Sequence, residues 1–85
     1  MDSNLFSVDY FKQALHLQIS KNLSYKTPIQ TMNSYYYTVV SAIIQDRINK
    51  NFELIRRIRN LDTAYKAVKE ELAQTEISVN GQNNH

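Results

Sequence analysis

Apolar residues recur at helical spacing in the first quarter of the chain, within residues 8–22. The stripe consists of Phe11, Leu15 and Ile19. A step of four places these side chains on one face of a helix. Ser7 can cap the first turn, and Asp9 lies where a negative charge is favourable near the positive end of the helix dipole. The pattern predicts a first helix over residues 8–22.

The second apolar stretch, within residues 28–48, contains a tyrosine- and valine-rich run that is typical of a strand by propensity alone. The apolar positions nevertheless step by three and four: Ile29, Met32, Tyr36, Val39 and Ile43. Thr27, Pro28 and Gln30 form a helix start, with a cap, a proline at the first position and a capping-box partner. The chain has one proline and one glycine, so the turn residues of hairpins are lacking. We therefore predict a second helix.

The third stretch, residues 52–75, has the most regular pattern. Its apolar positions form a heptad seam: Leu54, Ile58, Leu61, Tyr65, Val68 and Leu72. Charged residues occupy the other faces. The apolar pattern ends after this stretch. We therefore expect a single helical domain, residues 1–76, followed by a disordered tail, residues 77–85.

Residues 28–75 could form one helix or two. Ile43 and Leu54 are eleven residues apart, about three turns, so a continuous helix would keep both stripes on one face. The alternative is a break between Ile48 and Asn51, because asparagine is a poor interior helix former, and a second possible break lies at residues 60–62, where Asp62 could cap a new helix. Since no glycine or proline forces a turn there, we favour the continuous helix. The predicted fold class is all-α: a short first helix packed on a long helix or on a helical hairpin.

The continuous helix has a consequence for assembly. A first helix of fifteen residues spans only about 22 Å, so it could not cover the heptad seam. The seam would face water, and its burial is worth on the order of 10 kcal/mol. We therefore expect the six seam residues to form an interface with a second copy or another helical protein. With a break, the third segment would fold back and form a monomeric three-helix bundle.

Composition narrows the candidate functions. The chain has no cysteine, and its two histidines, His16 and His85, are far apart, so we expect no metal site and no cofactor. No secretory signal or membrane-spanning run is visible, and we expect a cytoplasmic protein with no membrane partner. No catalytic motif is readable, and no glycine-rich phosphate loop can form with one glycine. We expect a protein that is not an enzyme.

Two further groups of side chains could contact a partner. Tyr35 and Tyr37 flank the predicted inner position of Tyr36, and tyrosine is enriched at binding surfaces. Five cations could contact phosphates: Arg47, Lys50, Arg56, Arg57 and Arg59. The net charge of +2 does not by itself demand nucleic acid. We expect a small helical protein–protein interaction module, a regulator, adaptor or assembly subunit. A nucleic-acid-binding regulator that uses the basic face of residues 47–59 is the alternative.

Overall fold

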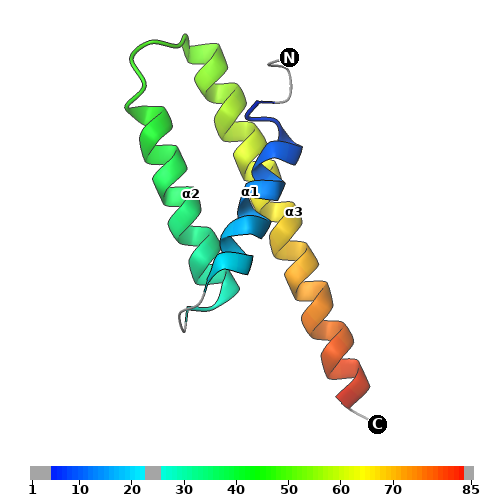
Figure 1. Cartoon of the computed structure of the whole chain (residues 1–85). Helices are drawn as coiled ribbons and strands as arrows, with labels where there is room; N and C mark the ends of the chain where they lie inside the picture. The colour runs from blue at the N-terminus through cyan, green and yellow to red at the C-terminus, as the bar shows by residue number, and fades with distance from the viewer. Residues whose placement is uncertain (1–4, 23–25, 84–85) are drawn as a thin grey trace.

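The structure is a computed structural model that describes the backbone of residues 5–22 and 26–83 and the side chains of residues 5–22 and 26–75. Its elements are α1 (Val8–Lys21), α2 (Pro28–Ile44) and α3 (Asn51–Asn83). The described residues contain no strand, which confirms the all-α prediction. Figure 1 shows α2 and α3 as a hairpin, with α1 lying across it and α3 projecting beyond the other two helices.

The two predicted helix starts are confirmed by their hydrogen bonds. The Ser7 hydroxyl accepts from the Tyr10 backbone N–H at 3.1 Å. The Thr27 hydroxyl accepts from the Gln30 N–H at 3.1 Å, and the Gln30 side-chain oxygen accepts from the Thr27 N–H at 3.0 Å. This reciprocal pair is a capping box, which satisfies two backbone donors that the first turn leaves without helical partners.

The prediction of one continuous helix over residues 28–75 is wrong, because α2 ends at Ile44 and α3 begins at Asn51. The side chain of Asp46 explains the break. Its Oδ1 accepts from the backbone N–H groups of Ile48 and Asn49, at 2.8 and 2.9 Å. In a continuous helix those N–H groups would bond to carbonyls one turn earlier, so the carboxylate competes with the helix for its donors. The break therefore begins a few residues before the alternative position.

The core is built where the three helices meet. Its buried side chains are Phe11, Leu15, Met32, Leu61, Ala64 and Val68. Tyr65 and Leu72 of the heptad seam pack against this cluster and are partly buried, and Leu54 and Ile58 are partly exposed. The seam is thus largely covered by α1 and α2 of the same chain. The exposed seam from which a dimer was predicted does not exist once α3 folds back.

The C-terminal part of α3 also differs from the expected disordered tail at residues 77–85. Its backbone stays helical as far as Asn83, and residues 84–85 lie outside the described part. Gly81 is the only residue of this segment with a strongly unfavourable helix propensity, about 1 kcal/mol relative to alanine. No proline follows to end the helix.

Candidate functional site

The outer surface of α2 is unusual because it carries no charge. From Thr27 to Gln45 the sequence contains no Lys, Arg, Asp, Glu or His. A helix at the surface normally exposes charged side chains on its outer face. The exposed positions of α2 beyond its first turn are instead neutral: Asn33, Ser34, Tyr37, Thr38, Ala42 and Ile44. Such a surface is less favourable in water than a charged one, and it can be buried without desolvating an ion.

A groove runs between α2 and α3 along this uncharged helix. It has a volume of about 720 Å³. Its lining is Asn33, Tyr36, Tyr37, Val40, Ser41 and Ile44 from α2, and Asp62, Tyr65, Lys66 and Lys69 from α3. Tyr37 and Ile44 are 75% and 69% exposed, whereas Tyr36, Val40 and Tyr65 are partly buried. The groove therefore has a largely apolar, aromatic wall on α2, and its charged side chains, Asp62, Lys66 and Lys69, are on its α3 side, where Lys66 pairs with Asp62 at 3.0 Å.

Direct contacts between α2 and α3 fix the shape of the groove. The rings of Tyr36 and Tyr65 pack edge to face, with their centroids 5.2 Å apart. The Tyr65 hydroxyl donates to the side-chain oxygen of Asn33. Edge-to-face aromatic pairs stabilise a fold beyond the area they bury. The groove is thus held in shape by its own lining residues.

The predicted aromatic surface of Tyr35 and Tyr37 is divided in the structure. Residues two apart on a helix point about 200° apart. Tyr35 packs against the core, and burial, with a smaller effect of Tyr10, raises its pKa. Tyr37 lies at the groove instead, together with Tyr36 and Tyr65. The sequence reasoning missed this grouping, although the absence of charge from α2 was a readable signal.

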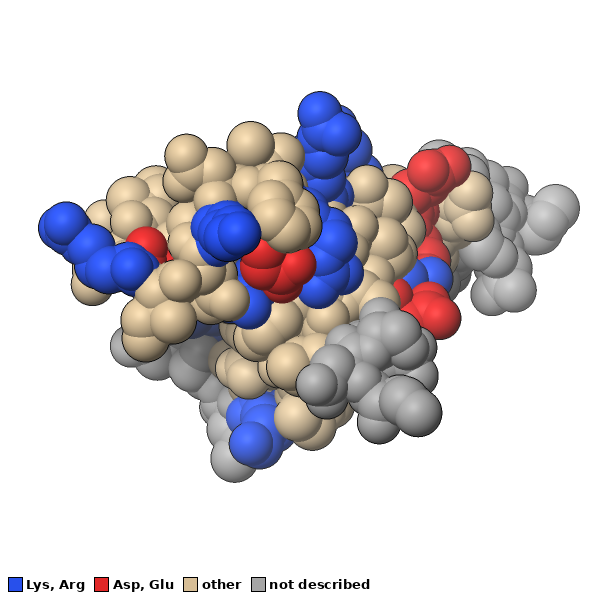
Figure 2. Space-filling model, turned by 90° about the horizontal axis from the view of Figure 1, so that it is seen from above, with Lys and Arg blue, Asp and Glu red and all other residues tan. Residues whose placement is uncertain are grey.

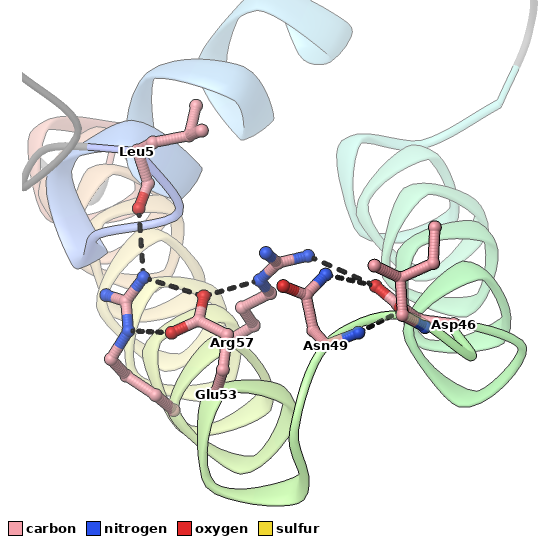
Figure 3. Close-up of polar contacts among 7 residues, drawn as sticks. Leu5, Asp46, Asn49, Glu53 and Arg57 are labelled. Carbon is pink, nitrogen blue, oxygen red and sulfur yellow. Dashed lines mark hydrogen bonds and ion pairs between the residues drawn. The ribbon is translucent and has the colours of Figure 1, made fainter.

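A polar network joins the α2–α3 turn to α3 and to the residues before α1 (Figure 3). Glu53 accepts from Arg56 Nε at 2.9 Å and from Arg57 Nε at 2.7 Å. Arg57 also lies 3.6 Å from the Asp46 carboxylate, and Arg56 donates to the Leu5 carbonyl at 3.2 Å. These contacts fix the turn against the body of the molecule.

The same contacts hold both carboxylates of the network ionised. Hydrogen bonds from Asn49, and then from the Ile48 backbone, lower the pKa of Asp46 to about 2, with a smaller contribution from Arg57. Hydrogen bonds from Arg56 and Arg57 lower the pKa of Glu53 to about 2. Donors aimed at a carboxylate favour its charged form.

The predicted phosphate contacts fall into two groups. Arg56 and Arg57 are engaged with Glu53 and are only partly exposed. The other three cations, Arg47, Lys50 and Arg59, are exposed and form no ion pair with any described residue. Only this second group is available to an external anion without breaking an existing contact.

Exposed apolar side chains lie near two of these cations: Ile48 and Phe52 line a hollow with Lys50, and Phe52 and Ile55 line another with Arg59. Ile48 is 94% exposed, Phe52 is 72% exposed and Ile55 is 50% exposed. Phe52 and Ile55 lie on the first turns of α3, outside the buried face that includes Leu61, whereas Ile48 lies in the turn that precedes α3. The sequence reasoning did not single out these three exposed apolar residues.

The histidine of the first helix takes part in a surface bridge. His16 Nε2 lies 3.1 Å from Glu71, which also contacts Lys12 at 3.3 Å. These contacts link α1 to α3. Over the residues that the structure describes, no group of three or more His, Asp and Glu side chains could hold a metal ion. Over the same residues, no helix is long and apolar enough to cross a membrane.

The fold and the groove define a small all-α protein in which a helical hairpin is covered on one side by a short first helix. Comparison with known proteins identifies its family. The chain belongs to the YvfG protein family, which matches residues 4–71. A protein of Bacillus subtilis (strain 168) described as "Uncharacterized protein YvfG" is 48% identical to it over 67 residues, which are 79% of this chain and 92% of that protein. The matched segment includes the groove and the α2–α3 turn.

Proposed function

We propose that this protein is a non-enzymatic interaction module that binds a helix of a second copy of itself along the α2–α3 groove. The observation that carries the proposal is the uncharged surface of α2 next to an apolar groove. Interface cores are depleted of charged residues and enriched in tyrosine. Tyr37 and Ile44, which are exposed in the single chain, are the side chains that would be buried.

The chemistry of α2 suits self-association in particular. In a twofold symmetric interface the same patch lies on both subunits, so a charge near the axis meets an identical charge. Because α2 carries none, two α2 helices can pack together without like-charge repulsion or an unpaired buried ion. Lys66 and Lys69 stand on the α3 side of the groove, where they can remain in solvent at the rim.

The test is the molar mass in solution by light scattering, from low to several hundred micromolar protein. We expect a dimer for the wild type and a monomer for Tyr37→Lys and Ile44→Lys, with unchanged helical circular dichroism. Leu17→Lys is the matched control, because Leu17 is 51% exposed on α1, away from the groove lining. It should remain dimeric. A wild-type protein that is monomeric at several hundred micromolar contradicts the proposal.

The second candidate is a nucleic-acid-binding regulator. The exposed cations Arg47, Lys50 and Arg59 support it. Two of the five basic residues of this face already pair with Glu53, which reduces the charge available to phosphates. We expect a dissociation constant for duplex DNA no lower than roughly 10⁻⁶ M near physiological salt. Nanomolar, sequence-specific binding that is lost in Arg59→Ala would favour this candidate over the first.

A further inference from the structure

The α2–α3 turn and the first turns of α3 form an exposed end of the molecule that the groove does not include. Ile48 lies at the turn, and Phe52 and Ile55 follow on α3. Their exposed fractions, between 50% and 94%, mean that these side chains gain little from folding. Figure 2 looks onto this end and shows several groups of Lys and Arg side chains, some of them next to Asp and Glu side chains, among uncharged surface.

The turn that presents Ile48 is held by hydrogen bonds and is not a loose loop. The Asp46 carboxylate accepts from the N–H groups of Ile48 and Asn49, and the Asn49 side chain donates to its other oxygen at 2.7 Å. Arg57 ties the same carboxylate to α3. The exposed position of Ile48 is therefore built into the fold, and binding through it requires little ordering of the backbone.

The charge of this end is strongly positive for so small a surface. Between residues 46 and 59 the chain has five cations and two carboxylates, Asp46 and Glu53, hence a net charge of +3, whereas the whole chain carries +2. The two carboxylates are already paired with Arg56 and Arg57. These four charges cancel, so the net charge of +3 comes from Arg47, Lys50 and Arg59, all of which are exposed.

We propose that this end binds the surface of an anionic lipid membrane, with Ile48 and Phe52 in the interfacial layer and Arg47, Lys50 and Arg59 against the lipid phosphates. Exposed apolar side chains next to lysine and arginine are the combination that holds proteins at anionic membrane surfaces. The contact is peripheral, and it uses a surface distinct from the α2–α3 groove. It does not depend on self-association through the groove.

The apolar residues favour a membrane over nucleic acid. Phosphates of a duplex would satisfy the three cations but would leave Ile48 and Ile55 in water, and only Phe52 could stack on a base. A lipid interface accepts both kinds of side chain at once, the apolar ones among the acyl chains and the cations at the headgroups. The expectation of no membrane partner rested on the lack of a spanning segment, which does not bear on a surface contact.

The absence of tryptophan from the sequence permits a direct test. Phe52→Trp introduces a single fluorophore at the proposed contact, and Tyr37→Trp introduces one at the groove as the matched control. Both proteins are titrated with vesicles of phosphatidylcholine alone or with 40% phosphatidylglycerol, the latter fraction being roughly that of a strongly anionic membrane. We expect a blue shift of Phe52→Trp emission with the anionic vesicles only, and no shift for Tyr37→Trp.

Further substitutions in the Phe52→Trp background separate the two parts of the contact. Ile48→Ser should weaken vesicle binding about tenfold through lost apolar burial. Each of Arg47→Gln and Lys50→Gln should weaken it about fivefold, which corresponds to about 1 kcal/mol per cation. Leu17→Ser, on α1, should leave it unchanged. Binding should also fall as salt rises.

Three results would overturn the proposal. The first is no spectral shift of Phe52→Trp at about 1 mM anionic lipid, a concentration at which weak peripheral binding is visible. The second is vesicle binding that Ile48→Ser leaves intact. The third is a Phe52→Trp protein that does not bind vesicles but binds duplex DNA with a salt-dependent affinity. That result would assign the cations to nucleic acid.

Discussion

The guanidinium of Arg57 lies over the ring of Phe6, 4.1 Å from its centroid. This contact joins the segment before α1 to α3. Phe6 has a positive φ of 60°, a left-handed conformation that is unfavourable for a bulky residue, so neighbouring contacts must hold it. The Asn60 side chain donates to the Phe6 carbonyl at 3.0 Å and supports the same conformation. Arg57 therefore connects three parts of the chain: the N-terminal segment, the α2–α3 turn and α3.

Removing Arg57 should weaken this connection measurably. Arg57→Ala loses the cation–π contact with Phe6, which is worth about 0.5–2 kcal/mol, and leaves Glu53 and Asp46 with fewer donors. We expect a lower midpoint of urea unfolding. Arg57→Lys keeps the charge but loses the planar group, so its urea midpoint should lie between those of the wild type and Arg57→Ala. Arg59→Ala, at an exposed position of the same helix, is the control, and an effect as large as that of Arg57→Ala would contradict the role assigned to Arg57.

Stability should fall at acid pH because of Asp46 and Glu53. Their pKa is about 2 in the folded protein, below the ordinary values of 3.8 and 4.5 that apply when it is unfolded. Between these limits the unfolded state binds more protons, so the free energy of unfolding decreases as pH is lowered from about 4.5 to about 2. Urea unfolding at a series of pH values measures this. The double variant Asp46→Asn, Glu53→Gln should show a smaller decrease, and an unchanged pH dependence would exclude these two groups as its source.

Leu61 distinguishes the single-chain core from a seam between two chains. It is fully buried where the helices meet. Leu61→Ala should lower the free energy of unfolding by about 2–5 kcal/mol. A loss of this size approaches the full stability of a small domain, so the more disruptive Leu61→Asp should unfold the whole domain. Helical circular dichroism and urea unfolding report both. If Leu61→Asp gave folded monomers with α1 still docked, the seam would have to belong to an interface after all.

The capping box at the start of α2 should contribute to stability by itself. Thr27→Ala removes the acceptor for the Gln30 N–H and should cost about 1 kcal/mol. Thr38→Ala is the matched control, because Thr38 is exposed within α2 and its hydroxyl donates to the Ser34 carbonyl one turn earlier. That variant should be neutral within about 0.5 kcal/mol. Equal losses in both variants, measured by thermal unfolding, would argue against a specific contribution of the cap.

The helices and two of their starting points could be predicted from the sequence because those signals are local. Ser7 and Thr27 cap helices that begin within a residue of the predicted positions, and the apolar steps identified the inner faces of all three helices. A cap requires only residues three positions apart, and a stripe requires only the helical period. Neither depends on where the other helices lie.

The tertiary structure decided what covers each stripe. The spacing of Leu61 and Val68 shows that one face of α3 is buried, but a cover from a second chain and a cover from α1 and α2 of the same chain produce the same pattern in sequence. The answer depended on Asp46, whose carboxylate takes the N–H groups of Ile48 and Asn49 and turns the chain back. The candidate surfaces followed from that turn, because the direction in which α3 leaves it determines which residues of α2 line a groove and leaves Ile48 exposed at the end of the molecule.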